Sequence, residues 1–395
     1  MKEVWKECKL GDLCIDNKGS YGIAASAVPY SENLYTYLRI TDINDDGTLN
    51  NSDLKSVADE NADKYLLKQN DIVFARTGGS TGRNYFYDGS DGTFVYAGFL
   101  IKFSIDSKKV NPKYIKYFCQ SQEYKNWVYS FNTGSTRGNI NAQTYANMPV
   151  ILPSRYQQDL LVTILSSLDD KIELNNKIND NLEQQAQAIF KSWFVDFEPF
   201  GGKMPEGWRI GKLSEIAEIT MGQSPDGKSY NEEGIGTVFY QGRAEFGNRF
   251  PTRRLFTTEP KRIAKKFDTL MSVRAPVGDT NIANEDCCIG RGLAAIHSKD
   301  NHQSFVHYTM LALRSQLDIF NGEGTVFGCI NRDAINNMEV LIPSKTDLDK
   351  FEQIVSSLDN EIYNRDEENR NMASLRDTLL PKLMNGEIEV DEVKV

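Results

Sequence analysis

The sequence predicts an α+β protein in which two related mixed α/β domains are joined by two long helices. First, residues 153–197 carry an apolar stripe in steps of three and four residues, over a length far beyond that of an ordinary helix. Second, the same pattern recurs in the second half of the chain, over residues 343–383, without a gap. Third, short β-like runs and glycine-rich turns fill the stretch before each helix. A repeat of this length indicates an internal duplication.

The first domain is predicted to span residues 1–152. Short β-like runs, such as residues 35–40, 72–75 and 94–105, alternate in it with Gly- and Asn-rich turns. Asn111 followed by Pro112 predicts the start of a helix that reaches Tyr124, because asparagine caps helices and proline suits their first turn. A polar loop flanked by glycines, residues 131–140, separates this helix from the first long one.

The first long helix is predicted over residues 153–198. Ser154 and Gln157 have the spacing of a capping box, and Pro199 with Gly201 and Gly202 marks the stop. The predicted stripe consists of Leu161, Ile164, Leu165, Leu168, Ile172, Ile178, Leu182, Ala186, Ile189 and Trp193. About 40 residues make a rod of about 60 Å, and a rod with so narrow an apolar seam needs a partner helix.

The second half repeats this plan, with a second domain over residues 199–342, a second helix over residues 343–386 and an acidic tail over residues 387–395. Ser344 and Asp347 give the second helix its predicted cap. Pro381 predicts that this helix ends or kinks near Leu380. Arg365 stands where the first helix has Asn175, so the predicted seam is imperfect.

The two domains resemble each other more loosely than the helices do. Residues 211–213 echo residues 11–13, residues 272–278 echo residues 74–82, and residues 324–331 echo residues 134–141. Such a relation is expected of two modules that do the same kind of work on different targets.

Composition narrows the function classes. The chain has 395 residues, no apolar run long enough to cross a bilayer, no secretory signal, and six cysteines without a CxxC pair. We therefore expect a cytoplasmic protein without a metal site or membrane contact. The net charge of −10 argues against nucleic acid, yet residues 249–266 hold seven basic side chains against the single acid Glu259. Binding of a polyanion depends on the local charge of the surface more than on the net charge of the chain. DNA therefore remains a possible ligand.

Two motifs suggest catalysis and are weak. Gly222 to Ser229 matches the phosphate-binding pattern GxxxxGK[ST], but Pro225 interrupts it and no helix is predicted to follow. Residues 111–114 resemble the NPPY loop of amino-methyltransferases but lack its second proline. Two alternatives to DNA recognition stay open: a nucleotide-dependent enzyme that uses the 222–229 loop, and a coiled-coil adaptor without DNA contact.

Polar loops with arginine, asparagine and glycine favour DNA binding. Arginine can bind guanine through two hydrogen bonds, asparagine can do the same with adenine, and glycine lets the backbone approach phosphate. The alternative is that these glycines only form turns and that the arginines are ordinary solvent-exposed residues. The candidate DNA-binding residues are Arg39, Arg76, Thr77, Gly78, Ser80, Arg83, Ser135, Thr136, Arg137, Asn139, Gln223, Ser224, Gln241, Arg243, Arg253, Arg254, Arg274 and Thr325.

At this point the chain resembles the specificity (S) subunit of type I restriction–modification systems over its whole length. The motifs are FKSWFVDFEP at residues 190–199, LRDTLLPKLMNGEI at residues 375–388 and MPEGW at residues 204–208. The segments MGQSPDG and YQGR resemble target-recognition segments of that family. The resemblance implies two target-recognition domains at opposite ends of an antiparallel helix pair, each reading half of a bipartite, asymmetric DNA site.

The same resemblance implies that the chain is non-catalytic and binds no cofactor. The helices would set the spacer between half-sites about one DNA turn apart, about 34 Å, and dock methyltransferase (M) subunits, with two expected. Restriction/translocase (R) subunits would complete the complex, with S-adenosylmethionine, ATP and Mg on the partner subunits. The candidate docking residues are Phe190, Trp193, Phe194, Phe197, Leu379, Leu380 and Leu383.

Overall fold

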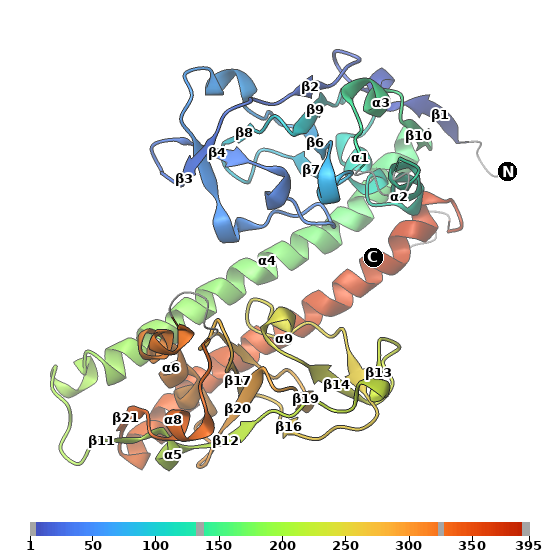
Figure 1. The fold of residues 1–395 in the computed structure, drawn as a ribbon. Helices are drawn as coiled ribbons and strands as arrows, with labels where there is room; N and C mark the ends of the chain where they lie inside the picture. Colours follow the sequence, from blue (N-terminus) through green and yellow to red (C-terminus); the bar gives the residue numbers. More distant parts are fainter. Residues whose placement is uncertain (1–4, 132–137, 323–327, 389–395) are drawn as a thin grey trace. The chain divides into compact units, whose positions relative to one another are not determined.

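The structure, a computed structural model, describes residues 5–131, 138–322 and 328–388 (Figure 1). The chain forms two compact units. Unit 1 comprises Met1–Ile172 and Arg370–Val395, and unit 2 comprises Glu173–Asn369. Each unit therefore contains one mixed α/β domain together with one part of each long helix.

The two long helices are α4 (Arg155–Phe194) and α9 (Lys345–Met384), each of 40 residues. Both begin as their caps predict: Gln157 N–H donates to Ser154 Oγ (3.4 Å), and Asp347 N–H donates to Ser344 Oγ (3.3 Å). The prediction of two long helices is confirmed, although each starts two residues later than predicted, since the Pro-Ser dipeptide lies outside the helix.

Pro381 was predicted to end or kink the second helix, and the structure excludes the first of these two outcomes. It lies inside α9, and its carbonyl oxygen still accepts a hydrogen bond from Asn385 N–H (3.0 Å). Leu380, Leu383 and Met384 are buried in the core of unit 1. Burial of that last turn offsets the hydrogen bond that proline cannot make, because tertiary packing supplies most of a helix's stability in a protein.

The domain of unit 1 has three sheets, of order β1-β10, β2-β9-β6-β7 and β3-β5-β4-β8. Phe74 and Tyr145 stack in its core with ring centroids 4.7 Å apart. Its strands and helices are β1 (Lys6–Lys9), β2 (Ser20–Tyr21), β3 (Ala27–Pro29), β4 (Tyr35–Leu38), β5 (Lys55–Val57), β6 (Asp71–Ala75), β7 (Asn84–Tyr87), β8 (Phe94–Tyr96), β9 (Leu100–Ser104), α1 (Pro112–Phe118), α2 (Gln122–Tyr129), α3 (Ala142–Ala146) and β10 (Pro149–Leu152).

The domain of unit 2 has sheets of order β11-β21, β12-β20-β17-β18 and β13-β15-β14-β19-β16. Its strands and helices are β11 (Arg209–Lys212), α5 (Leu213–Ile216), β12 (Ala217–Met221), β13 (Tyr230–Asn231), β14 (Thr237–Tyr240), β15 (Phe256–Thr257), β16 (Ile263–Ala264), β17 (Thr269–Ser272), β18 (Thr280–Ile282), β19 (Cys287–Ile289), β20 (Leu293–Ser298), α6 (Gln303–Ala312), α7 (Arg314–Leu317), α8 (Arg332–Asn336) and β21 (Glu339–Ile342).

The two domains share one topology. Sheet β2-β9-β6-β7 corresponds to β12-β20-β17-β18, and the parallel pair β4-β8 corresponds to the parallel pair β14-β19. The predicted α+β class and internal duplication are confirmed. One predicted correspondence is wrong by three residues: Leu10 N–H donates to Met148 O and Leu213 N–H to Met338 O, so Leu213 matches Leu10, not Leu13.

Within each unit the two helix segments run antiparallel. In unit 1, Asp169 of α4 accepts from Arg376 of α9 (2.9 Å), and Leu161 and Leu165 share a core with Leu383. Unit 2 instead has a polar layer in the seam. Asn175, fully buried, donates to Asn369 Oδ1 (2.9 Å) and Glu368 (2.7 Å), and it accepts from Arg365 (3.2 Å).

A tyrosine and an aspartate fasten each domain to its helices at equivalent places. In unit 1, Tyr117 of α1 donates to Asp169 (2.8 Å), which also accepts from Lys116 (3.0 Å). In unit 2, Tyr308 of α6 donates to Asp359 of α9 (2.9 Å). The two aspartates are equivalent in the duplication, because each ends the same Ser-Ser-Leu-Asp motif of its helix.

Unit 2 adds a largely buried cation to this contact. Arg249, only 11% exposed, comes from a domain loop and forms ion pairs with Glu183 of α4 and Asp359 of α9. The domain of unit 2 is thus held to both helix segments by charge as well as by apolar packing.

Candidate nucleic-acid interface

Loops from the two larger sheets of unit 2 meet in an arrangement that we call the loop crossing, formed by residues 222–224, 240–242, 273–274 and 290–292. It lies where strands β12, β14, β17 and β19 end. Four backbone hydrogen bonds of 2.8–2.9 Å hold it together: Gly222 N–H to Leu293 O, Gln223 N–H to Ile289 O, Gly290 N–H to Tyr240 O and Val273 N–H to Gly292 O.

Unit 1 contains the same loop crossing, formed by residues 22–24, 38–39, 76–77 and 97–99. The equivalent four bonds measure 3.0–3.2 Å: Gly22 N–H to Leu100 O, Ile23 N–H to Tyr96 O, Ala97 N–H to Leu38 O and Arg76 N–H to Phe99 O. The duplication has therefore preserved backbone geometry here while the side chains have diverged.

Glycine makes the crossing possible. A Cβ atom on Gly222 would lie 2.1 Å from the carbonyl oxygen of Gly290, and one on Gly22 would lie 2.3 Å from those of Tyr96 and Ala97. Backbone cannot give way as a flexible side chain can, so these glycines are explained by close approach of two chain segments.

The glycine-rich loop before each long helix joins the crossing. Ile140 N–H donates to Arg76 O (2.9 Å), and Ile330 N–H donates to Val273 O (3.1 Å). In unit 1, Thr81 Oγ1 also donates to Gly138 O (2.9 Å). The structure thus brings together two loops that are distant in the sequence of each domain. Four predicted site residues on these loops lie outside the described residues: Ser135, Thr136, Arg137 and Thr325.

Arg76 and Arg274 do not occupy equivalent positions, although the echo between residues 74–82 and 272–278 suggested it. The backbone bonds above match Arg76 with Val273, one residue earlier. The guanidinium of Arg76 lies over the ring of Tyr21, 5.1 Å from its centroid. Arg274 is exposed, and among the described residues its side chain has no hydrogen-bond or ion-pair partner. The guanidinium of Arg274 is therefore available to bind a ligand.

Five other candidate arginines each face a carboxylate within their own domain. Each ion pair partly neutralises the positive charge of its arginine at the surface that a polyanion would contact. It also gives the arginine a structural role within its domain. The pairs are Arg39 with Asp42 (2.6 Å), Arg83 with Asp45 (2.7 Å), Arg243 with Asp279, Arg253 with Glu285, and Arg254 with Glu245 (2.8 Å). DNA contact by these five stays a prediction.

The basic run at residues 249–266 does not form one patch. Arg249 is buried against the helices, Arg253 and Arg254 pair with glutamates, and Lys266 lies over the ring of Tyr363, 4.0 Å from its centroid. Lys261, Arg262 and Lys265 are exposed. The density of basic residues in sequence therefore overstates the charge that this face presents.

The remaining predicted residues lie at or beside the crossings. Gly78, with φ +77°, has open space around the position of a Cβ atom, and it precedes Ser80 in the same short turn. Thr77 forms a bridge with Asn139, which is exposed. Gln223 and Gln241 are exposed in unit 2.

Sequence reasoning missed Arg291. Its backbone N–H donates to Ser224 Oγ (3.3 Å), which places it at the tip of the loop crossing in unit 2. The signal was available, since Arg291 stands between Gly290 and Gly292, the pattern of a tight loop that presents one side chain.

The 222–229 loop does not have the geometry of a phosphate site. Gly222 to Ser224 belong to the crossing, and Gly227–Ser229 form a single short turn whose next element is strand β13. Phosphate-binding loops lead into a helix whose N–H groups bind the anion, and no helix follows here among the described residues. The sequence match is therefore accidental.

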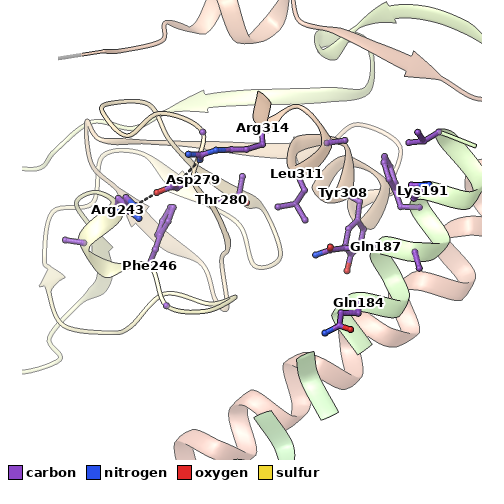
Figure 2. Close-up of a pocket in the computed structure, with 17 residues that line it drawn as sticks. Gln184, Gln187, Lys191, Arg243, Phe246, Asp279, Thr280, Tyr308, Leu311 and Arg314 are labelled. Carbon is purple, nitrogen blue, oxygen red and sulfur yellow. Dashed lines mark hydrogen bonds and ion pairs between the residues drawn. The ribbon is translucent and has the colours of Figure 1, made fainter. Parts of the chain in front are cut away.

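Figure 2 shows an open pocket of about 1210 Å³ within unit 2. Gln184, Gln187 and Lys191 of α4 form one wall. On the opposite side, Arg243 and Arg314 converge on Asp279. The lining mixes these polar groups with apolar residues that include Phe246 and Leu311.

Most of the predicted docking residues lie in domain cores. Phe190 and Phe194 pack with Phe305 and Phe351 in unit 2, and Leu380 and Leu383 are buried in unit 1. Leu379, Trp193 and Phe197 are partly buried against the same cores. These side chains are already used to hold the domains on the helices, so burial accounts for their apolar character without a partner.

Three further observations concern the chemistry of the chain. Among the described residues, no helix combines the length and apolarity that a membrane span needs, and no group of three or more His, Cys, Asp or Glu side chains could hold a metal ion. Burial strongly lowers the pKa of His307, and Arg249 lowers it further, so this histidine stays neutral inside unit 2.

The repeated fold and its loop crossings define a protein built from two copies of one mixed α/β module. A family model described as type I restriction modification DNA specificity domain matches residues 2–184 and 205–370. The chain belongs to this family.

Its relatives are specificity subunits. The chain is 30% identical over 354 residues to the putative type I restriction enzyme MjaX specificity subunit of Methanocaldococcus jannaschii, covering 85% of this chain and 83% of that protein. It is 24% identical to the HindI specificity subunit of Haemophilus influenzae, covering 97% and 99%. The crystal structure of a type I restriction–modification S subunit from M. genitalium is 17% identical, with a TM-score of 0.62 over 97% of this chain and 96% of that one, and shows a shared fold.

Proposed function

We propose that this chain is the DNA-recognition subunit of a type I restriction–modification complex. Each unit reads one half of a bipartite, asymmetric site in double-stranded DNA, and the helix pair sets the spacer. The observation that carries the proposal is the loop crossing: five backbone hydrogen bonds recur in both units, while the side chains that they present differ. Two domains that recognise different DNA sequences can share one backbone geometry, but they must present different side chains to the bases.

The chemistry of the exposed groups supports DNA as the ligand. Arg274 and Arg291 have no carboxylate partner among the described residues, and Gln223 and Gln241 are exposed beside them. Guanidinium and amide groups are those that distinguish base pairs in the major groove. The paired arginines would contribute to orientation by contacting phosphate.

We also propose that the chain has no catalytic centre of its own. Methylation, ATP-driven translocation and cleavage would belong to M and R subunits, with two M subunits expected and S-adenosylmethionine, ATP and Mg bound there. The exposed faces of α4 and α9 would dock the M subunits. Val195, 53% exposed at the end of α4, is a better candidate for such contact than its buried neighbour Phe194.

The experiment is methylation sequencing of a host that expresses this chain together with its M subunit. The proposal predicts a bipartite methylated motif with a fixed spacer, which is absent when this chain is omitted. Methylation without a motif, or an identical motif without this chain, would contradict it. A gel-shift assay with the M subunit present separates DNA recognition from an adaptor role, because an adaptor would leave the shift independent of DNA sequence.

A further inference from the structure

The tip of the loop crossing carries one large exposed side chain in each unit, at positions one residue apart. Leu293 N–H donates to Gly290 O (3.0 Å), and in unit 1 Leu100 N–H donates to Ala97 O (2.8 Å). The two residues enclosed by each turn are Arg291 and Gly292 in unit 2, and Gly98 and Phe99 in unit 1. Arg291 is exposed, and Phe99 is 57% exposed.

Sterics dictate which of the two positions can bear a side chain. A Cβ atom on Gly292 would lie 2.9 Å from the carbonyl oxygen of Gln241 and 3.1 Å from Cα of Gly242. In unit 1, a Cβ atom on Gly98 would lie 3.2 Å from the carbonyl oxygen of Ile23. In each unit, therefore, the side chain stands at the tip position that is not crowded by the neighbouring loop.

Arg291 has the surroundings of a ligand-binding group. Its backbone is fixed by Ser224 Oγ, and two exposed amides, Gln223 and Gln241, come from the loops that cross beside it. Its guanidinium has no carboxylate partner among the described residues, in contrast to Arg243, Arg253 and Arg254 of the same unit. All its donors are thus available for a ligand.

We propose that the crossing tip is a specificity-determining position in both units, with Arg291 reading a guanine in one half-site and Phe99 contacting a thymine methyl group in the other. Arginine binds guanine O6 and N7 with two hydrogen bonds, whereas an aromatic ring can contact only the apolar part of a base edge. This assignment rests on the proposed function, since it names the residues by which each unit would read its half-site.

The test compares methylated motifs of complexes that contain Arg291→Ala, Arg291→Lys and Phe99→Ala, each expressed with the M subunit. Arg291→Ala should reduce discrimination at one base pair of one half-site by about 10-fold or more, as expected for loss of a bidentate contact. Arg291→Lys should do the same, because the ammonium group keeps the charge but not the paired donors. Phe99→Ala should relax the other half-site only.

Arg209→Ala is the matched control, because it removes the same charge from the same unit at an arginine of strand β11 that is paired with Glu215 and lies outside the loop crossing. The control should leave the motif unchanged. The assignment of Arg291 is overturned if its variants keep the full motif, whether binding is unaffected or is uniformly weaker with a shallower salt dependence, since the latter marks a phosphate contact. If the unaltered complex itself yields no bipartite motif, the proposed function fails instead, and the two failures are thereby distinguished.

Discussion

At the residue scale, charged side chains divide into those that hold the fold and those that remain available. Arg249 is the clearest structural case, since it is 11% exposed and faces Glu183 and Asp359. Its sequence neighbourhood is basic and suggested DNA contact. Sequence alone could not show that one partner lies far before it in the chain and the other far after it, because ion pairs across a fold leave no local pattern.

Replacing Arg249 by methionine should therefore destabilise unit 2. Loss of the guanidinium leaves the partly buried carboxylates of Glu183 and Asp359 without their cation. We expect a cost of about 2 kcal/mol in the free energy of unfolding, measured by urea denaturation. Arg253→Met is the control, because its ion pair is about 40% exposed on both sides and should contribute less than about 1 kcal/mol. Equal effects of the two substitutions would refute the structural role of Arg249.

Asp169 should make the stability of the protein depend on pH. Burial opposes ionisation of this carboxyl, but Lys116, Arg376 and Tyr117 outweigh burial and lower its pKa. A carboxyl whose pKa is lower in the folded state contributes stability above its unfolded pKa of about 4, and loses it as the pH falls through the folded value.

Stability of the unaltered protein should accordingly fall below about pH 4, and Asp169→Asn should be less stable at neutral pH and lose less on acidification. Urea denaturation at pH 3 and pH 7 measures both effects. Parallel loss of stability in the two proteins would show that Asp169 is not a source of the acid sensitivity. Asp159→Asn is a suitable comparison, since the Asp159 carboxylate is half exposed and binds Arg155 and Asn111 near the surface.

At the element scale, the long helices were predictable because their apolar residues recur with helical period and their caps are local. Ser154 with Gln157 and Ser344 with Asp347 form the expected hydrogen bonds. The second helix continues past Pro381 for a physical reason: the local rule allows an end or a kink, and burial of Leu383 in a core assembled from distant segments stabilises the turn that follows the proline. The sequence around Pro381 does not reveal that Leu383 will be buried, because the core is formed by residues far away in the chain.

The helix pair also yields the element-scale prediction. Inserting four residues between Asp169 and Leu182 should lengthen α4 by about one turn, or about 6 Å. We expect the spacer of the methylated motif to change while both half-sites stay the same. The test is methylation sequencing, with a four-residue substitution at the same place as the length-matched control. An unchanged spacer in the insertion variant would contradict a ruler role for the helix.

At the scale of the whole molecule, the internal duplication is clear in the sequence of the helices but weak in the sequence of the domains. The helix motifs keep one constant spacing along the chain, whereas Leu213 lies further than that spacing from its equivalent Leu10. Insertions and deletions within the domains shift the register, so short echoes such as Gly11–Leu13 misalign. The loop crossings could not be predicted either, because they depend on backbone contacts such as that between Gly222 and Gly290.

We propose that each unit reads one half of the DNA site independently, and a domain exchange is the direct test of this independence. Residues 1–150 would be replaced by the corresponding domain of a related specificity subunit, and the methylome of a host that expresses the hybrid with its M subunit would be sequenced. We predict that one half-site changes to that of the donor while the other half-site and the spacer remain. A methylome in which both half-sites change, or neither does, would contradict the account.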